Sequence, residues 1–197
     1  MLFNRINTLL FAGACAPSPE AAPTDTANTD TDSVSEFVDY SADGMSVRSL
    51  EPTRYLGVWY EIATTPSFQE ANCTGTTAEY GFIDDETISV YNRCYIGALD
   101  GRLNEIEGTA SFADDSFARL FVDFGFGFDA PYNVVELDGA DGDEPYQFAA
   151  VNSAGFQMWV LSRTPTMDPD LYDRLMARLD AQGLDTSEFE RTEQPTE

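Results

Sequence analysis

Apolar and polar residues alternate along most of the chain between positions 57 and 163. A period of two is typical of β-strands that bury one face, and each alternating run is short and ends in a turn-like sequence. In residues 117–124, for example, apolar side chains on one face alternate with mixed side chains on the other. The pattern predicts eight strands, at about 57–64, 74–82, 87–94, 104–112, 117–124, 131–138, 145–151 and 156–163.

A helical pattern follows the last of these strands. Asp168 is a favourable N-cap, Pro169 suits a first turn, and leucines recur at helical spacing before Gly183. Eight antiparallel strands fit one closed up-and-down barrel. The predicted fold class is therefore all-β, an eight-stranded antiparallel barrel with one C-terminal α-helix against its wall. If Trp59 begins the first strand at the closed end, the connections around the mouth are about 65–73, 95–103, 125–130 and 152–155.

The N-terminal part of the chain has a different composition. Residues 1–14 contain one Arg and an apolar run too short to span a bilayer, which predicts a secretory signal peptide. Residues 15–45 are rich in Ala, Pro, Thr, Asp and Ser and contain no basic residue, so we expect a disordered acidic tether after Cys15. Residues 46–197 are the predicted barrel domain.

The charge and the missing residue types exclude several classes of function. The formal net charge is −25, there is no His, and all ten basic residues are Arg. Without His or Lys, the chain has no imidazole metal ligand, no Ser-His pair and no Schiff-base lysine. Nucleic-acid binding is also excluded, because it depends on cationic contacts with phosphates. We expect no catalytic residue, no metal and no cofactor, and an acidic surface that suits a salty medium.

Three motifs carry a family resemblance: Gly57 to Ala63 as Gly-x-Trp-Tyr-Glu-Ile-Ala, Tyr132 to Asp138 as Tyr-x-Val-x-x-Leu-Asp, and Trp159 to Pro165 as Trp-Val-Leu-Ser-Arg-Thr-Pro. With them, residues 49–194 resemble the lipocalins, in particular the bacterial lipocalins and their relatives similar to apolipoprotein D. The resemblance implies that Arg163 packs across Trp59 at the closed end of the barrel, with Gly57 and Tyr60 in the same structural motif. A guanidinium over an indole stabilises by about 0.5 to 2 kcal/mol.

The resemblance also implies a ligand cavity inside the barrel. Tyr132 and Trp159 match pocket-lining positions of bacterial lipocalins, although core packing is the alternative for any such aromatic. Glu136 is expected to face inward, where it would need a partner or a raised pKa and would limit the depth of the cavity. The expected ligand-binding residues are inward positions of three strands: Leu120, Val122, Phe124, Tyr132, Val134 and Trp159.

The function that the resemblance implies is binding, storage or transport of fatty acids, lysophospholipids or similar small hydrophobic ligands at the bacterial cell envelope. Two alternatives stay open: an enzyme on a lipocalin barrel, which the missing His and Lys argue against, and a structural envelope protein with a filled barrel. A monomer or a homodimer is expected.

The segment Ala12-Gly13-Ala14-Cys15 resembles a lipoprotein signal box. It implies that Cys15 carries lipid, such as palmitate, and anchors the protein to the outer membrane, facing the periplasm. Ala12 and the short apolar run depart from the usual pattern. A soluble periplasmic or secreted protein is the alternative.

Cys73 and Cys94 straddle a hairpin that turns near residues 83–85. Counting from that turn places them opposite or diagonally opposite each other at the mouth, close enough for a disulfide. An exported protein also meets an oxidising compartment. The sequence therefore predicts a Cys73–Cys94 disulfide, with a free thiol pair as the alternative.

Phe126 and Phe128 alternate with glycines on a predicted mouth loop. They predict either an entry gate or membrane-touching tip, or a loop that folds back over the rim. Acidic groups at 84–85, 114–115 and 141–144 lie in turn-like stretches without EF-hand spacing, so we expect solvated turn charge there.

Overall fold

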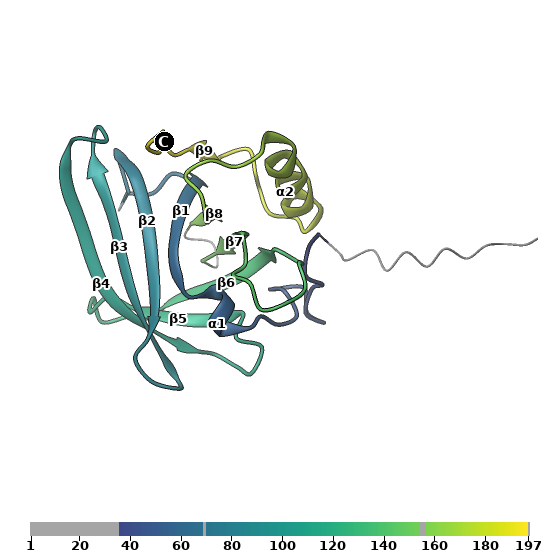
Figure 1. Ribbon diagram of the computed structural model, residues 1–197. Helices are drawn as coiled ribbons and strands as arrows, with labels where there is room; N and C mark the ends of the chain where they lie inside the picture. The colour runs from purple at the N-terminus through teal and green to yellow at the C-terminus, as the bar shows by residue number, and fades with distance from the viewer. Residues whose placement is uncertain (1–35, 69, 154–156, 197) are drawn as a thin grey trace, which may run out of the picture. The chain divides into compact units, whose positions relative to one another are not determined.

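The computed structural model describes residues 36–68, 70–153 and 157–196. Within them, eight antiparallel strands form a closed barrel, in which each strand pairs with its neighbour in the chain and β1 also pairs with β8 to close the ring (Figure 1). The eight-stranded barrel predicted from alternation is confirmed. Its strands are β1 (Gly57–Thr64), β2 (Cys73–Phe82), β3 (Thr87–Ile96), β4 (Arg102–Phe112), β5 (Arg119–Asp123), β6 (Ala130–Leu137), β7 (Phe148–Asn152) and β8 (Met158–Ser162).

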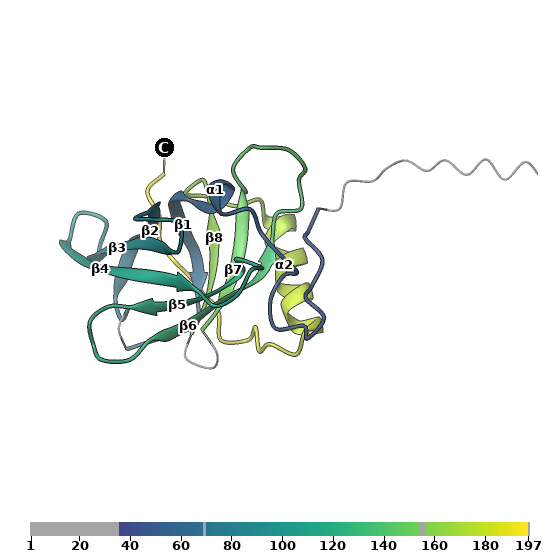
Figure 2. The same cartoon turned by 90° about the horizontal axis from the view of Figure 1, so that it is seen from below.

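The predicted C-terminal helix, α2 (Pro169–Ala181), is also confirmed. The Asp168 side chain accepts a hydrogen bond from the backbone N–H of Leu171 at 3.0 Å, which caps the first turn. Leu175 and Leu179 are fully buried against the outside of the barrel, and α2 lies along the wall in both views (Figure 2). A short helix, α1 (Pro52–Tyr55), and a short strand, β9 (Glu190–Arg191), complete the fold.

Glu136 does not face the cavity, contrary to the sequence prediction. The pairing of β6 with β7 shifts register between Val134 and Glu136, which interrupts the alternation of faces. Glu136 therefore points to α2, where its carboxylate accepts hydrogen bonds from Arg178 Nε at 2.8 Å and Gln182 Nε2 at 2.7 Å. Tyr40 also donates to it. The carboxylate joins the barrel to the helix and does not limit the cavity.

The barrel unit begins before residue 46, which corrects the expected end of the tether. Phe37 forms a β-bridge with Asp138, and Tyr40 forms one with Val47. Phe37 is buried beside Phe148 and belongs to the apolar cluster between α2 and the barrel. The expected signal peptide and Cys15 lie outside the described residues.

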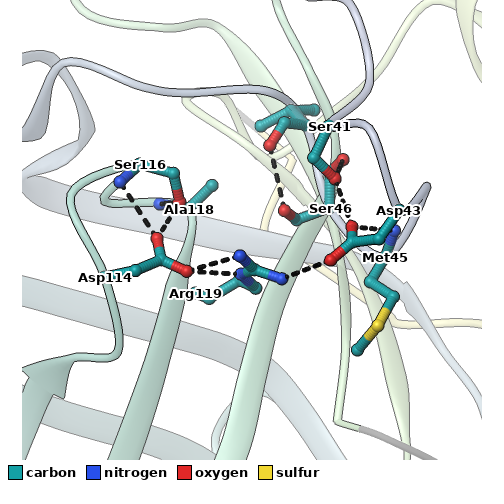
Figure 3. Close-up of polar contacts among 9 residues, drawn as sticks. Ser41, Asp43, Met45, Ser46, Asp114, Ser116, Ala118 and Arg119 are labelled. Carbon is teal, nitrogen blue, oxygen red and sulfur yellow. Dashed lines mark hydrogen bonds and ion pairs between the residues drawn. The ribbon is translucent and has the colours of Figure 1, made fainter.

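A charged cluster ties this N-terminal segment to the closed end of the barrel (Figure 3). Arg119 Nη1 donates to Asp43 Oδ2 at 2.8 Å, and Arg119 Nη2 lies 2.6 Å from Asp114 Oδ2. Asp114 also accepts the N–H of Ser116 at 2.9 Å within the β4–β5 turn. Asp114 therefore fixes a turn, and no group of three or more His, Cys, Asp or Glu within the described ranges is arranged to hold a metal.

The predicted disulfide between Cys73 and Cys94 is confirmed, with the two Cα atoms 5.4 Å apart. Cys73 lies opposite Ile96 in the β2–β3 pairing, so the two cysteines are diagonal neighbours. The bond joins the start of β2 to the end of β3 at the mouth of the barrel.

The β5–β6 loop at the mouth exposes its two phenylalanines. Phe126 is 67% exposed and Phe128 is 60% exposed, so neither folds back over the rim. In the part of the chain that the structure describes, no helix has the length and apolar character needed to cross a bilayer.

Candidate ligand-binding site

The closed end of the barrel is built around Trp59 and Arg163. Trp59 is fully buried, and the Arg163 guanidinium carbon lies 3.8 Å from the centre of its indole ring. Gly57 has φ +93°, and a Cβ there would lie 3.6 Å from Arg163 Nη1. Tyr60 is the next residue along from Trp59 and pairs with Ser162 of β8.

The same guanidinium donates hydrogen bonds to backbone carbonyls of three segments. Nη1 donates at 2.8 Å to Val58, and Nε donates at 2.9 Å to Tyr146. Nη2 donates at 2.9 to 3.1 Å to the carbonyls of α1 and its end: Arg54, Tyr55 and Leu56. One planar, five-donor side chain thus joins α1, β1 and the β6–β7 connection, which gives it a structural role.

Above this closed end lies a cavity of about 90 Å³ that opens toward the mouth. Of the residues expected to bind ligand, four line it: Val122, Phe124, Tyr132 and Trp159. Leu120 and Val134 face the same interior but belong to the packed core around Trp59. They do not line the cavity. Alternation predicts which side chains face the interior of the barrel, but it does not predict how far along the barrel the cavity extends.

Tyr80 and Tyr132 line the cavity, and their hydroxyl groups connect to Tyr55 in the packed core below. The Tyr132 hydroxyl lies 2.8 Å from that of Tyr55 and 3.0 Å from that of Tyr80. Burial raises the pKa of all three, for Tyr80 to about 12, so the hydroxyls stay protonated at neutral pH. Three hydroxyl protons serve two Tyr–Tyr hydrogen bonds, so one proton is not used within this group.

Two glutamates that were not among the expected site residues line one wall. Glu61 of β1 is 3% exposed, and Glu70 lies in the β1–β2 connection beside Trp159, whose Nε1 is 3.2 Å from Glu70 Oε2. Gln157 Nε2 also donates to Glu70. Burial and the nearby charge of Glu70 raise the pKa of Glu61 to about 8, and burial also raises the pKa of Glu70.

The C-terminal segment reaches this wall through a gap between β1 and β2. β9 pairs with the end of β1, and the N–H of Gly75 in β2 donates to the carbonyl of Glu193 at 2.7 Å (Figure 1). Thr192 Oγ1 then donates to Glu61 Oε1 at 2.5 Å. Gln194 Nε2 bridges the carbonyls of Glu61 and Thr76 at 2.7 and 2.8 Å. The segment therefore holds Glu61 in place.

Comparison with known proteins identifies the family. The Lipocalin-like domain family matches residues 50–194. The chain belongs to the lipocalins. The outer membrane lipoprotein Blc of Vibrio cholerae is 36% identical over 143 residues, which cover 72% of this chain and 81% of that protein. Mouse apolipoprotein D is 31% identical over 153 residues, 74% of this chain and 78% of that protein.

Solved structures agree on the fold. Insecticyanin from the tobacco hornworm Manduca sexta matches with a TM-score of 0.58 at 20% identity, over 75% of this chain and 82% of that chain. Lipocalins bind small hydrophobic ligands and are generally binding or transport proteins, and the cavity of this lipocalin is the place where such a ligand would lie.

Proposed function

We propose that this lipocalin binds one single-chain amphiphile inside its barrel and carries or sequesters it. Fatty acids and lysophospholipids belong to this class. The observation that carries the proposal is the cavity inside the barrel, whose apolar wall of Val90, Val122 and Leu161 faces a few polar groups. Its volume of about 90 Å³ is below the roughly 300–1,000 Å³ of typical small-molecule sites. A slender chain suits it better than a broad ring system.

Trp159→Ala should weaken binding of a single-chain lipid at least tenfold, because the indole forms part of the cavity wall and also holds Glu70. Native mass spectrometry of gently purified protein shows whether lipid is retained. Titration with a fluorescent single-chain lipid, corrected for folded fraction, then gives the affinities.

Met158→Ala is the matched control, since Met158 precedes Trp159 on β8 and does not line the cavity. It should bind like the wild type. An unchanged affinity in Trp159→Ala, or a wild-type protein that retains and binds no lipid, would contradict the proposal.

We also propose that the protein works at the bacterial envelope, tethered through lipidated Cys15. Support comes from the signal-like sequence that ends at Cys15 and from the similarity to outer membrane lipoproteins. The alternative is a soluble periplasmic or secreted lipocalin. In both cases the barrel would meet its ligand outside the cytoplasm.

Cys15→Ser should move the protein from the membrane fraction of a Gram-negative host to the soluble fraction, because lipid can no longer be attached at this position. Fractionation and mass analysis of the mature N-terminus measure this. A Cys73→Ser/Cys94→Ser double variant is the control, and it should stay in the membrane fraction. Equal partitioning of Cys15→Ser and wild type would show that Cys15 is no anchor.

A further inference from the structure

The polar wall of the cavity is rich in acceptors and acidic. Glu61 and Glu70 line it, and the lining residues include no Arg. Three Arg residues of the barrel strands and the closed end have other partners: Arg163 contacts the carbonyls of the closed end, Arg93 donates to Thr77 at 3.0 Å, and Arg191 lies 3.4 Å from the ring centre of Tyr172. Two buried carboxyl groups therefore share a cavity without a cation.

Two buried side-chain oxygens on this wall have no hydrogen-bond partner among the described residues. Thr76 is 8% exposed, and its Oγ1 has no hydrogen-bond partner among the described residues. The same holds for Asn92 Oδ1. Thr192 is the sole donor to the Glu61 carboxyl within the described ranges, and it uses Oε1. A buried acceptor without a donor costs free energy, so a ligand that brings donors would be stabilised here.

We propose that Glu61, Glu70, Thr76 and Asn92 form a subsite for a positively charged nitrogen, so that the preferred ligand is a single-chain alkylammonium amphiphile. An ammonium group has three N–H donors and no acceptor, which matches a wall of acceptors. The inference rests on the proposed function and specifies the head group of its ligand.

The surroundings of the subsite favour the same charge. Trp159 and Tyr80 line the cavity beside the carboxyl groups, and aromatic faces attract cations. A fatty-acid carboxylate would instead bring a third carboxyl group into a site that already holds two without a cation, where ionisation of any of them is disfavoured. Among single-chain lipids, free fatty acids are therefore the class that this wall disfavours.

The cavity also separates head from tail. The acidic wall belongs to β1, β2 and their connection, whereas Val122 comes from β5, across the barrel in the strand order, and Phe124 directly follows β5. The C-terminal segment holds Glu61, and Trp159 with Gln157 holds Glu70, so the two carboxyl groups are fixed before a ligand enters. The alkyl chain would pack against the β5 side.

Calorimetric titration of the delipidated protein at pH 7 tests the subsite with three ligands that share one chain: dodecylamine, 1-dodecanol and dodecanoate, each below its aggregation concentration. Dodecylamine should bind at least tenfold more tightly than dodecanoate. Glu61→Gln and Glu70→Gln should each reduce this preference at least threefold, since Gln keeps the shape but cannot give up a proton to become the anion that pairs with an ammonium group. Circular dichroism verifies that both variants fold.

Glu79→Gln is the control for net charge, because Glu79 is an exposed glutamate of β2 that does not line the cavity. It should leave the preference unchanged. If it lowers amine affinity as much as Glu61→Gln, the attraction comes from the −25 surface and the subsite is wrong. If all three ligands bind alike, the head-group inference fails and the lipid-binding function stands. If none binds, the proposed function itself fails.

Discussion

Arg163→Ala should lower the free energy of unfolding by about 2 to 4 kcal/mol. The substitution removes the group that lies 3.8 Å from the Trp59 ring centre and leaves five backbone carbonyls without their charged donor. Hydrogen bonds to charged groups contribute about 1.5 to 3 kcal/mol each when isolated, but Arg163 is partly exposed, so water replaces some of them. Urea unfolding followed by tryptophan fluorescence gives the difference.

Two variants give this prediction its controls. Arg163→Lys should recover less than half of the loss, because one ammonium cannot bridge carbonyls that a planar fork reaches together. Arg174→Ala removes an exposed Arg that pairs with Glu36 on the surface, and should cost about 1 kcal/mol or less. Ligand affinity of the folded Arg163→Ala protein should change little. Loss of binding in fully folded protein would assign Arg163 to the site instead of the scaffold.

Alternation and motifs were enough to predict the barrel, the helix, the disulfide and four of the residues that line the cavity, because each depends on a regular period, a motif or counting from a turn. Alternation does not predict the direction of a side chain that follows a β-bulge. One register shift in β6 turns Glu136 outward to α2, and another between Glu61 and Ala63 places Ala63 under the helix cluster. No Gly or Pro stands at either shift to mark it in the sequence.

The acidic wall was harder to predict for a different reason. Glu61 shares a motif and a face with Trp59, so its inward direction follows from alternation, but its partners do not. Glu70 lies in an irregular connection, and Thr192 reaches the wall from the far end of the sequence. Segments without a period give no direction for a side chain, so only tertiary structure brings these groups together.

The largest pH effect on stability should come from Glu61. Burial raises its folded-state pKa to about 8, whereas its ordinary value is 4.5. Below about pH 4.5 the carboxyl is protonated in both states and does not disfavour folding. Between these values the unfolded chain releases the proton and the folded protein keeps it, so stability falls as pH rises and the loss is complete above about pH 8. Glu61→Gln should therefore stabilise the delipidated protein by about 2 to 4 kcal/mol at pH 8.5, and hardly at all at pH 4.5.

Urea unfolding of wild type and Glu61→Gln at pH 4.5, 6.5 and 8.5, at fixed ionic strength, measures this difference. Among the groups around Glu61, Glu70 also changes its charge in this pH range, because its pKa is raised as well. Tyr80 and Tyr132 stay neutral, and Thr192 carries no charge. Glu79→Gln controls for repulsion across the acidic surface and should show no such rise with pH. A stability gain in Glu61→Gln that is the same at all three pH values would mean that folding does not change the pKa of this carboxyl, and the raised pKa would be wrong.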